Sequence, residues 1–121
     1  MTCDVTHSPS VTAAADYIAK RSPDGLAAVI NNAGVIVEGA LELVPPEDWR
    51  RVLEINVLGS ALVRQKFLPL LRRGHGRVIN ISATSARVAP PLYGPIAASK
   101  AALESLSNAA RIELAPCGPR S

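Results

Sequence analysis

Two short segments, the wholly apolar residues 26–30 and residues 77–82 with three aliphatic side chains, are separated by a long amphipathic segment. Such short segments are typical of buried strands, and the first, five apolar residues without alternation, predicts a strand covered on both faces. Between them, apolar side chains recur every three or four residues from 47 to 72, which predicts a helix that Pro69 kinks or ends near its last turn. Two strands joined through a helix pair in parallel, with a right-handed crossover.

Further elements are predicted on both sides of this unit. Residues 2–5 form a short strand candidate, and Ser8 or Ser10 can cap a helix that continues to about Arg21. A last helix is predicted over residues 95–115, where a proline- and glycine-rich end stops it. The alternation of strands and helices indicates an α/β fold with a parallel sheet.

Composition narrows the function classes. With 121 residues, 48% hydrophobic and 19% charged, the chain holds at most one globular domain. The net charge of +3 comes without an arginine tract, so we expect no nucleic-acid binding. Cys3 and Cys117 form neither a metal-ligand pair nor a disulfide framework, and no apolar stretch is long enough for a membrane span. We therefore expect a cytoplasmic protein without a metal site.

Five segments, in order along the chain, carry a resemblance to a known family. Asn31-Asn32-Ala33-Gly34 directly follows the first apolar run and looks like the NNAG motif of short-chain dehydrogenases/reductases. The other four are similar to the family's adenine-side strand end, asparagine-bearing helix, strand before the active site and lysine-bearing helix. They are residues 4–6, 54–57, 76–82 and 95–106. The resemblance implies a Rossmann-like, doubly wound parallel sheet, and residues 1–121 would be part of an NAD(P)-binding domain.

The resemblance also implies the site on the cofactor's adenosine side. Asp4 and Val5 would lie beside the adenine, although Asp4 taken alone also fits an Asx turn or a helix cap. Asn31, Asn32, Ala33 and Gly34 would let the backbone approach the ribose or adenine closely, because alanine and glycine leave space. A plain turn after the strand is the alternative for that motif.

Two of the four catalytic groups that the resemblance implies are present. Asn56 lies within an otherwise apolar helix face, which predicts a buried amide that needs hydrogen-bond partners. The resemblance implies that it holds a water of a proton relay, and a solvent-facing asparagine is the alternative. Lys100 would bind the nicotinamide ribose and lower the pKa of a neighbouring phenol.

The other two catalytic positions carry hydrocarbon. The tyrosine expected four residues before Lys100 is Ile96, and the serine expected thirteen residues before that tyrosine is Ala83. A rescue in which Tyr93 acts with Ser82 or Thr84 is conceivable. We expect Tyr93 to lie outside the helix, because Gly94 and Pro95 follow it.

No glycine cluster of the kind that binds a pyrophosphate occurs in the sequence. We therefore expect the chain to be the middle of a dehydrogenase domain, from a truncated or misdelimited gene product. It would lack the first two strands and the C-terminal strands, and bind NAD or NADP weakly or not at all.

Two functions follow as hypotheses. The first is an NAD(P)-dependent oxidoreductase for an alcohol/ketone pair, inactive as this chain. The second is a non-catalytic oligomerisation module, because the family's helices that match 47–72 and 95–115 pack against a partner subunit. A homo-oligomer through these two helices is therefore expected.

Overall fold

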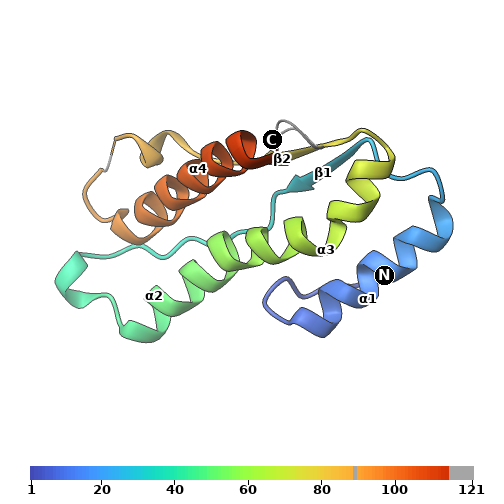
Figure 1. Cartoon of the computed structure of the whole chain (residues 1–121). Helices are drawn as coiled ribbons and strands as arrows, with labels where there is room; N and C mark the ends of the chain where they lie inside the picture. Colours follow the sequence, from blue (N-terminus) through green and yellow to red (C-terminus); the bar gives the residue numbers. More distant parts are fainter. Residues whose placement is uncertain (89, 115–121) are drawn as a thin grey trace.

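The computed structural model of the chain describes residues 1–88 and 90–114 (Figure 1). Four α-helices and two strands are assigned within these residues, and a π-helical turn joins two of the helices. In chain order they are α1 (Ser8–Arg21), β1 (Ala28–Asn31), α2 (Pro46–Leu53), the π-helical turn (Glu54–Leu58), α3 (Gly59–Arg73), β2 (Arg77–Asn80) and α4 (Gly94–Leu114). Short 3-10 turns lie at Leu41–Leu43 and Thr84–Ala86.

The two strands are adjacent and parallel, with Ala28 opposite Arg77 and Asn31 opposite Asn80. The predicted parallel pairing is thus confirmed, and α2, the π-helical turn and α3 form the connection between the strands. Pro69 does not end the helix, because α3 continues to Arg73.

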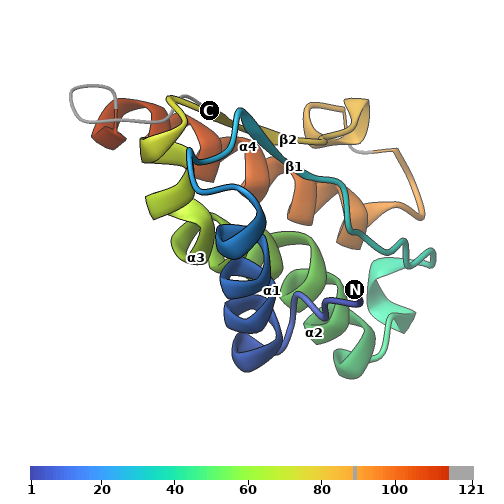
Figure 2. The ribbon, with the colours of Figure 1, turned by 90° about the vertical axis from the view of Figure 1, so that its right-hand side faces the viewer.

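The core lies between the strands and the helices on one side of them. In Figure 2 the strands run along the upper edge of the molecule, with α1, α2 and α3 beneath them. α3 packs against both strands, α4 against β2, and α1 against α3. The fully buried apolar side chains come from all these layers: Val11, Val52, Leu71, Val78 and Leu103.

The opposite face of the sheet is open. Ile30 is 61% exposed, and Ile79 and Ile81 are 40% and 41% exposed. The prediction of strands covered on both faces was therefore wrong. Side chains alternate across a strand, and in the described residues the packed helices cover one face alone.

The first residues also differ from expectation. Residues 2–5 form no strand. Among the described residues the sheet consists of β1 and β2, and neither of them pairs with this segment. His7, not Ser8 or Ser10, precedes α1 as its N-cap residue, and no side chain caps the helix. Ser10 Oγ instead accepts a hydrogen bond from the Asp4 N–H at 2.8 Å.

At the other end, α4 includes Leu114, and the predicted helix end at Ala115 lies outside the described residues, as does Cys117. Tyr93 directly precedes α4, as expected. Among the helices of the described residues, none has the length and apolar character needed to cross a membrane.

Candidate active site

A cavity of about 230 Å³ lies between the loop after β1 and the first turns of α4. Lys100, on α4, is 9% exposed and lines this cavity. Its Nζ donates a hydrogen bond to the Ile81 carbonyl oxygen at 2.8 Å. Burial lowers the pKa of Lys100 below the ordinary value of 10.5, because removal of water disfavours the ammonium form. The full lining is Asn32, Gly34, Val35, Ile36, Ala83, Ile96 and Lys100.

Ile96 and Ala83 line the same cavity as Lys100. Ile96 stands one helical turn before Lys100 and is 7% exposed. The two residues at which the resemblance leads us to expect a phenol and a hydroxyl thus line one cavity with the lysine, and both side chains are hydrocarbon.

Asn56 lies in the π-helical turn between α2 and α3 and is 1% exposed, so its amide needs hydrogen-bond partners. Its Oδ1 accepts from the Val35 N–H at 2.9 Å, and its Nδ2 donates to the Val35 carbonyl at 3.1 Å. The structure therefore excludes the solvent-facing alternative for Asn56. π-Helical turns occur often at functional sites.

Gly34 is the point at which Asn56 and Lys100 meet the loop after β1. A Cβ at Gly34 would stand 3.2 Å from Asn56 Oδ1 and 3.7 Å from Lys100 Nζ. Both groups thus approach the same stretch of backbone. The close approach of Asn56 Oδ1 leaves little space there for a side chain.

Ser99 belongs to the same buried cluster, and the sequence interpretation missed it. Its side chain is completely buried, its Oγ accepts from Asn56 Nδ2 at 3.0 Å, and it donates to the Ile96 carbonyl at 2.8 Å. The available signal was a serine three residues after Ile96, on the same side of a helix. Ser99 connects the π-helical turn to the first turns of α4.

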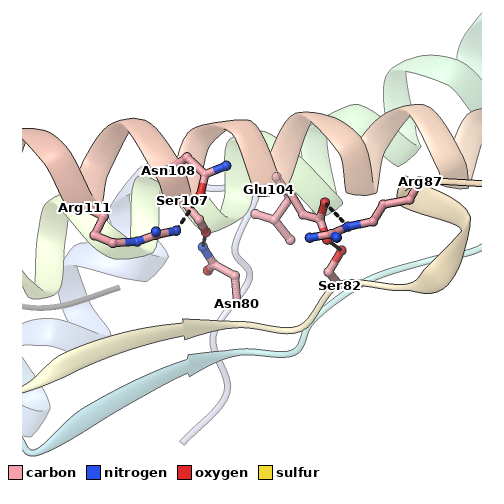
Figure 3. A pocket seen from close by; sticks show the side chains of 8 residues that line it. Asn80, Ser82, Arg87, Glu104, Ser107, Asn108 and Arg111 are labelled. Atoms are coloured by element: carbon pink, nitrogen blue, oxygen red, sulfur yellow. Dashed lines mark hydrogen bonds and ion pairs between the residues drawn. The ribbon is translucent and has the colours of Figure 1, made fainter.

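Tyr93, Ser82 and Thr84 are not part of the cavity lining. Tyr93 is 38% exposed at the start of α4. Ser82 Oγ donates to Glu104 Oε1 at 3.2 Å in a second, polar cavity of about 220 Å³ between β2 and α4 (Figure 3).

Pairs of interacting side chains surround the second cavity. Arg87 Nε lies 3.6 Å from Glu104 Oε2. Figure 3 also shows Asn80, which donates to Ser107, and Arg111, which donates to Asn108. The polar side chains that line the second cavity thus form hydrogen bonds and an ion pair with one another.

On the adenosine side that the motifs imply, a smaller cavity of about 110 Å³ is present. Its lining is Val5, Ile30, Asn31, Asn32, Ala33, Ile55, Gly59, Ser60 and Val63. Asn31 Nδ2 donates to Asn80 Oδ1 at 2.8 Å, which directs this side chain toward the neighbouring strand. Asn32 lines both this cavity and the one beside Lys100.

Asp4 is not in the lining of the smaller cavity. Its Oδ1 accepts from the Thr6 N–H at 2.9 Å and from Thr6 Oγ1 at 2.7 Å, which is the Asx turn considered as an alternative. These hydrogen bonds lower the pKa of Asp4 because they stabilise the carboxylate.

Residues 1–118 match the family model described as short chain dehydrogenase. Mitochondrial D-beta-hydroxybutyrate dehydrogenase of Mus musculus is 36% identical over 95% of this chain and 34% of its own length. NADPH-dependent 3-dehydrocapnine reductase of Ornithobacterium rhinotracheale is 38% identical over 92% of this chain and 41% of its own length.

Solved structures of short-chain dehydrogenases are also similar to this chain. A short-chain dehydrogenase from Streptomyces avermitilis superposes with a TM-score of 0.91 at 30% identity, over 99% of this chain and 44% of the other. An NAD+-bound xylitol dehydrogenase superposes with a TM-score of 0.92 at 28% identity, over 99% of this chain and 46% of the other. The chain spans less than half the length of these relatives. It belongs to the short-chain dehydrogenase/reductase family and has an incomplete Rossmann-like α/β fold.

Proposed function

We propose that residues 1–121 are part of the NAD(P)-binding domain of a cytoplasmic oxidoreductase for an alcohol/ketone pair, and that this chain alone is catalytically inactive. Family membership supports the reaction class, and Asn56 and Lys100 occupy the matching motif positions. The observation that carries the inactivity is the presence of Ile96 and Ala83 in the Lys100 cavity.

The chemistry explains why these two residues matter. When bound, the nicotinamide cofactor supplies a hydride to the carbonyl carbon, and the oxygen then needs a proton. Ile96 has no proton to give, and Ala83 has no hydroxyl to polarise the carbonyl. Lys100, whose burial favours the neutral amine, would serve to hold a ribose hydroxyl.

The described residues fit a dinucleotide at its two ends. Val5 and residues 31–33 would hold the adenosine half and Lys100 the nicotinamide ribose, and Asn32 lines both cavities. The sequence contains no glycine-rich turn for the pyrophosphate. We expect no binding of NADH or NADPH at micromolar concentrations. Enhanced nicotinamide fluorescence in that range would contradict this.

A chimera tests the catalytic part. We would join residues 1–118 to the flanking segments of a close relative and measure cofactor binding and ketone reduction. The chimera should bind cofactor and remain slow. Ile96→Tyr with Ala83→Ser should then raise turnover by orders of magnitude, because a positioned general acid contributes about 10²–10⁴ and an oxyanion donor about 10²–10³. The two effects need not multiply, since both groups act on one oxygen.

Two further variants are the controls for the chimera. Adding Lys100→Met to the double variant should abolish the gained activity. If the unmodified chimera already turns over briskly and Tyr93→Phe abolishes that activity, Tyr93 is a displaced catalytic tyrosine and the proposal for Ile96 is wrong.

A groove between α3 and α4 favours the second function, an oligomerisation module. This cavity of about 270 Å³ is lined by alanines and leucines of both helices, with polar residues among them. The full lining is Ala61, Arg64, Gln65, Leu68, Leu106, Ala109, Ala110 and Glu113. Small residues allow close helix approach, so we propose that a second copy of the chain packs here. Ala109→Arg should reduce the mass measured by light scattering to that of one chain. The control Ala13→Arg, at an exposed position of α1, should not.

A further inference from the structure

Lys100 combines a buried amine with an apolar cavity. Of the described residues that line this cavity, Lys100 is the ionisable one. The walls beside it are the aliphatic side chains of Val35, Ile36, Ala83 and Ile96. An amine in such surroundings resembles the desolvated lysines that act as nucleophiles toward carbonyl compounds.

The hydrogen bonds leave the nitrogen able to react. Nζ donates one N–H to the Ile81 carbonyl at 2.8 Å, and a neutral amine retains its lone pair for an electrophile. Burial lowers the pKa of Lys100 and so shifts its protonation equilibrium toward this neutral form.

The nearest acid on the same helix is engaged elsewhere. Glu104, one turn after Lys100, accepts from Ser82 and pairs with Arg87 in the second cavity. It therefore does not line the Lys100 cavity.

We propose that Lys100 forms an imine with small uncharged aliphatic aldehydes and ketones that enter this cavity, a reaction distinct from hydride transfer. Nζ attacks the carbonyl carbon, and its proton passes through water to the carbonyl oxygen, which gives a carbinolamine. Loss of that hydroxyl as water forms the C=N bond. One water leaves and nothing is oxidised or reduced. The apolar walls favour uncharged alkyl chains over anionic carbonyl compounds.

Reductive trapping tests this on the full 121-residue chain without nicotinamide cofactor. The chain is incubated with butanal and sodium cyanoborohydride, which reduces the imine to a stable secondary amine. Peptide mass spectrometry then measures alkylation at each of the three lysines. Lys20, which is exposed, and Lys66, which is half-buried, are internal references.

At pH 7 we expect alkylation of Lys100 to be severalfold faster than that of either reference lysine. With glyoxylate, an anionic aldehyde, this advantage should fall. Alkylation of Lys100 at or below the rate of Lys20, in a chain that circular dichroism shows to be folded, would overturn the proposal. An unchanged advantage with glyoxylate would overturn the preference for uncharged carbonyl compounds.

Two variants make the test specific. Ile36 is 65% exposed and lines the cavity, so Ile36→Asp adds a carboxylate with little effect on the core. That charge favours the ammonium form, and alkylation of Lys100 should slow severalfold while Lys20 is unaffected. The control Lys66→Arg should leave the rate at Lys100 unchanged, and a matching loss there would contradict a local effect. Because no nicotinamide is present, a failed oxidoreductase proposal does not change these outcomes.

Discussion

Both faces of the sheet carry β-branched aliphatic side chains, but the two faces have opposite environments. On the helix-covered face, Val78 is 1% exposed, whereas Ile30 and Ile79 on the other face are 61% and 40% exposed. Both sets lie on the same two strands. Burial in this chain is therefore decided by where the helices pack rather than by the hydrophobicity of the strands.

The candidate site lies on the covered side of the sheet, with the helices. Asn56 comes from the helical connection between β1 and β2, and Ser99 and Lys100 come from α4, which packs against β2. The packing that removes water from the core also buries these polar groups. Stability and the geometry of the site should therefore respond to the same substitutions, and both should be insensitive to the open face.

The largest difference in the free energy of unfolding is expected between a leucine in the core and an isoleucine on the open face. Leu103 is 1% exposed, so Leu103→Ala should lower the free energy of unfolding by about 2–5 kcal/mol, through lost burial and a cavity. Ile30→Ala on the open face should lower it by less than about 1 kcal/mol, because much of its side chain is already in water. Urea unfolding followed by circular dichroism measures both. Equal losses would mean that the open face is covered in solution.

The next effect concerns the polar cluster of the covered side. Asn56→Ala leaves the Val35 backbone groups without their partner and should cost about 1–3 kcal/mol. Ser99→Ala removes two neutral hydrogen bonds, with Asn56 and with the Ile96 carbonyl, and should cost about 1–2 kcal/mol.

Because they share the hydrogen bond between Asn56 and Ser99, the two substitutions together should cost less than the sum of their separate effects. Ser105→Ala, at an exposed position of α4, is the control and should stay within about 0.5 kcal/mol of the parent chain. Strict additivity of Asn56→Ala and Ser99→Ala would show that they do not interact.

Periodicity predicted the parallel strand pair and the helical connection, because both follow from local patterns along the chain. It also predicted that Asn56 is buried, since an amide on an apolar helix face must find partners. The identities of those partners were not predictable, because Val35 and Ser99 lie 21 and 43 residues away from Asn56.

The sequence pattern gave wrong or missing predictions for features that depend on how distant segments pack. The apolar run that contains Ile30 has the same sequence pattern whether helices cover one face of the strand or both. Residues 2–5 read as a strand, but strand pairing requires a neighbour that a sequence pattern does not supply. The π-helical turn at Asn56 also has no periodic signature, because the apolar spacing continues through it.

The smallest expected effect is the pH dependence that Lys100 adds to the covered side. Burial lowers the pKa of Lys100 in the folded chain, whereas in the unfolded chain it returns to about its ordinary value of 10.5. Between the two pKa values the unfolded chain binds more protons, so the free energy of unfolding rises with pH there. Below the lowered pKa this contribution to the free energy of unfolding is constant and unfavourable.

The substitution Lys100→Met removes this contribution, together with the pH-independent hydrogen bond to Ile81. The difference in unfolding free energy, parent minus variant, should therefore increase as pH rises toward 10.5, and its absolute offset carries no information. The increase should be modest, since the buried amine lies beside a cavity that opens to solvent, so its loss of hydration is partial. Urea unfolding of both chains at several pH values from 7 to about 10.5 measures it. The same series with Lys20→Met, an exposed position, should be flat. A parent-minus-variant difference for Lys100 that falls with rising pH would mean that a carboxylate stabilises its charged form in the folded chain.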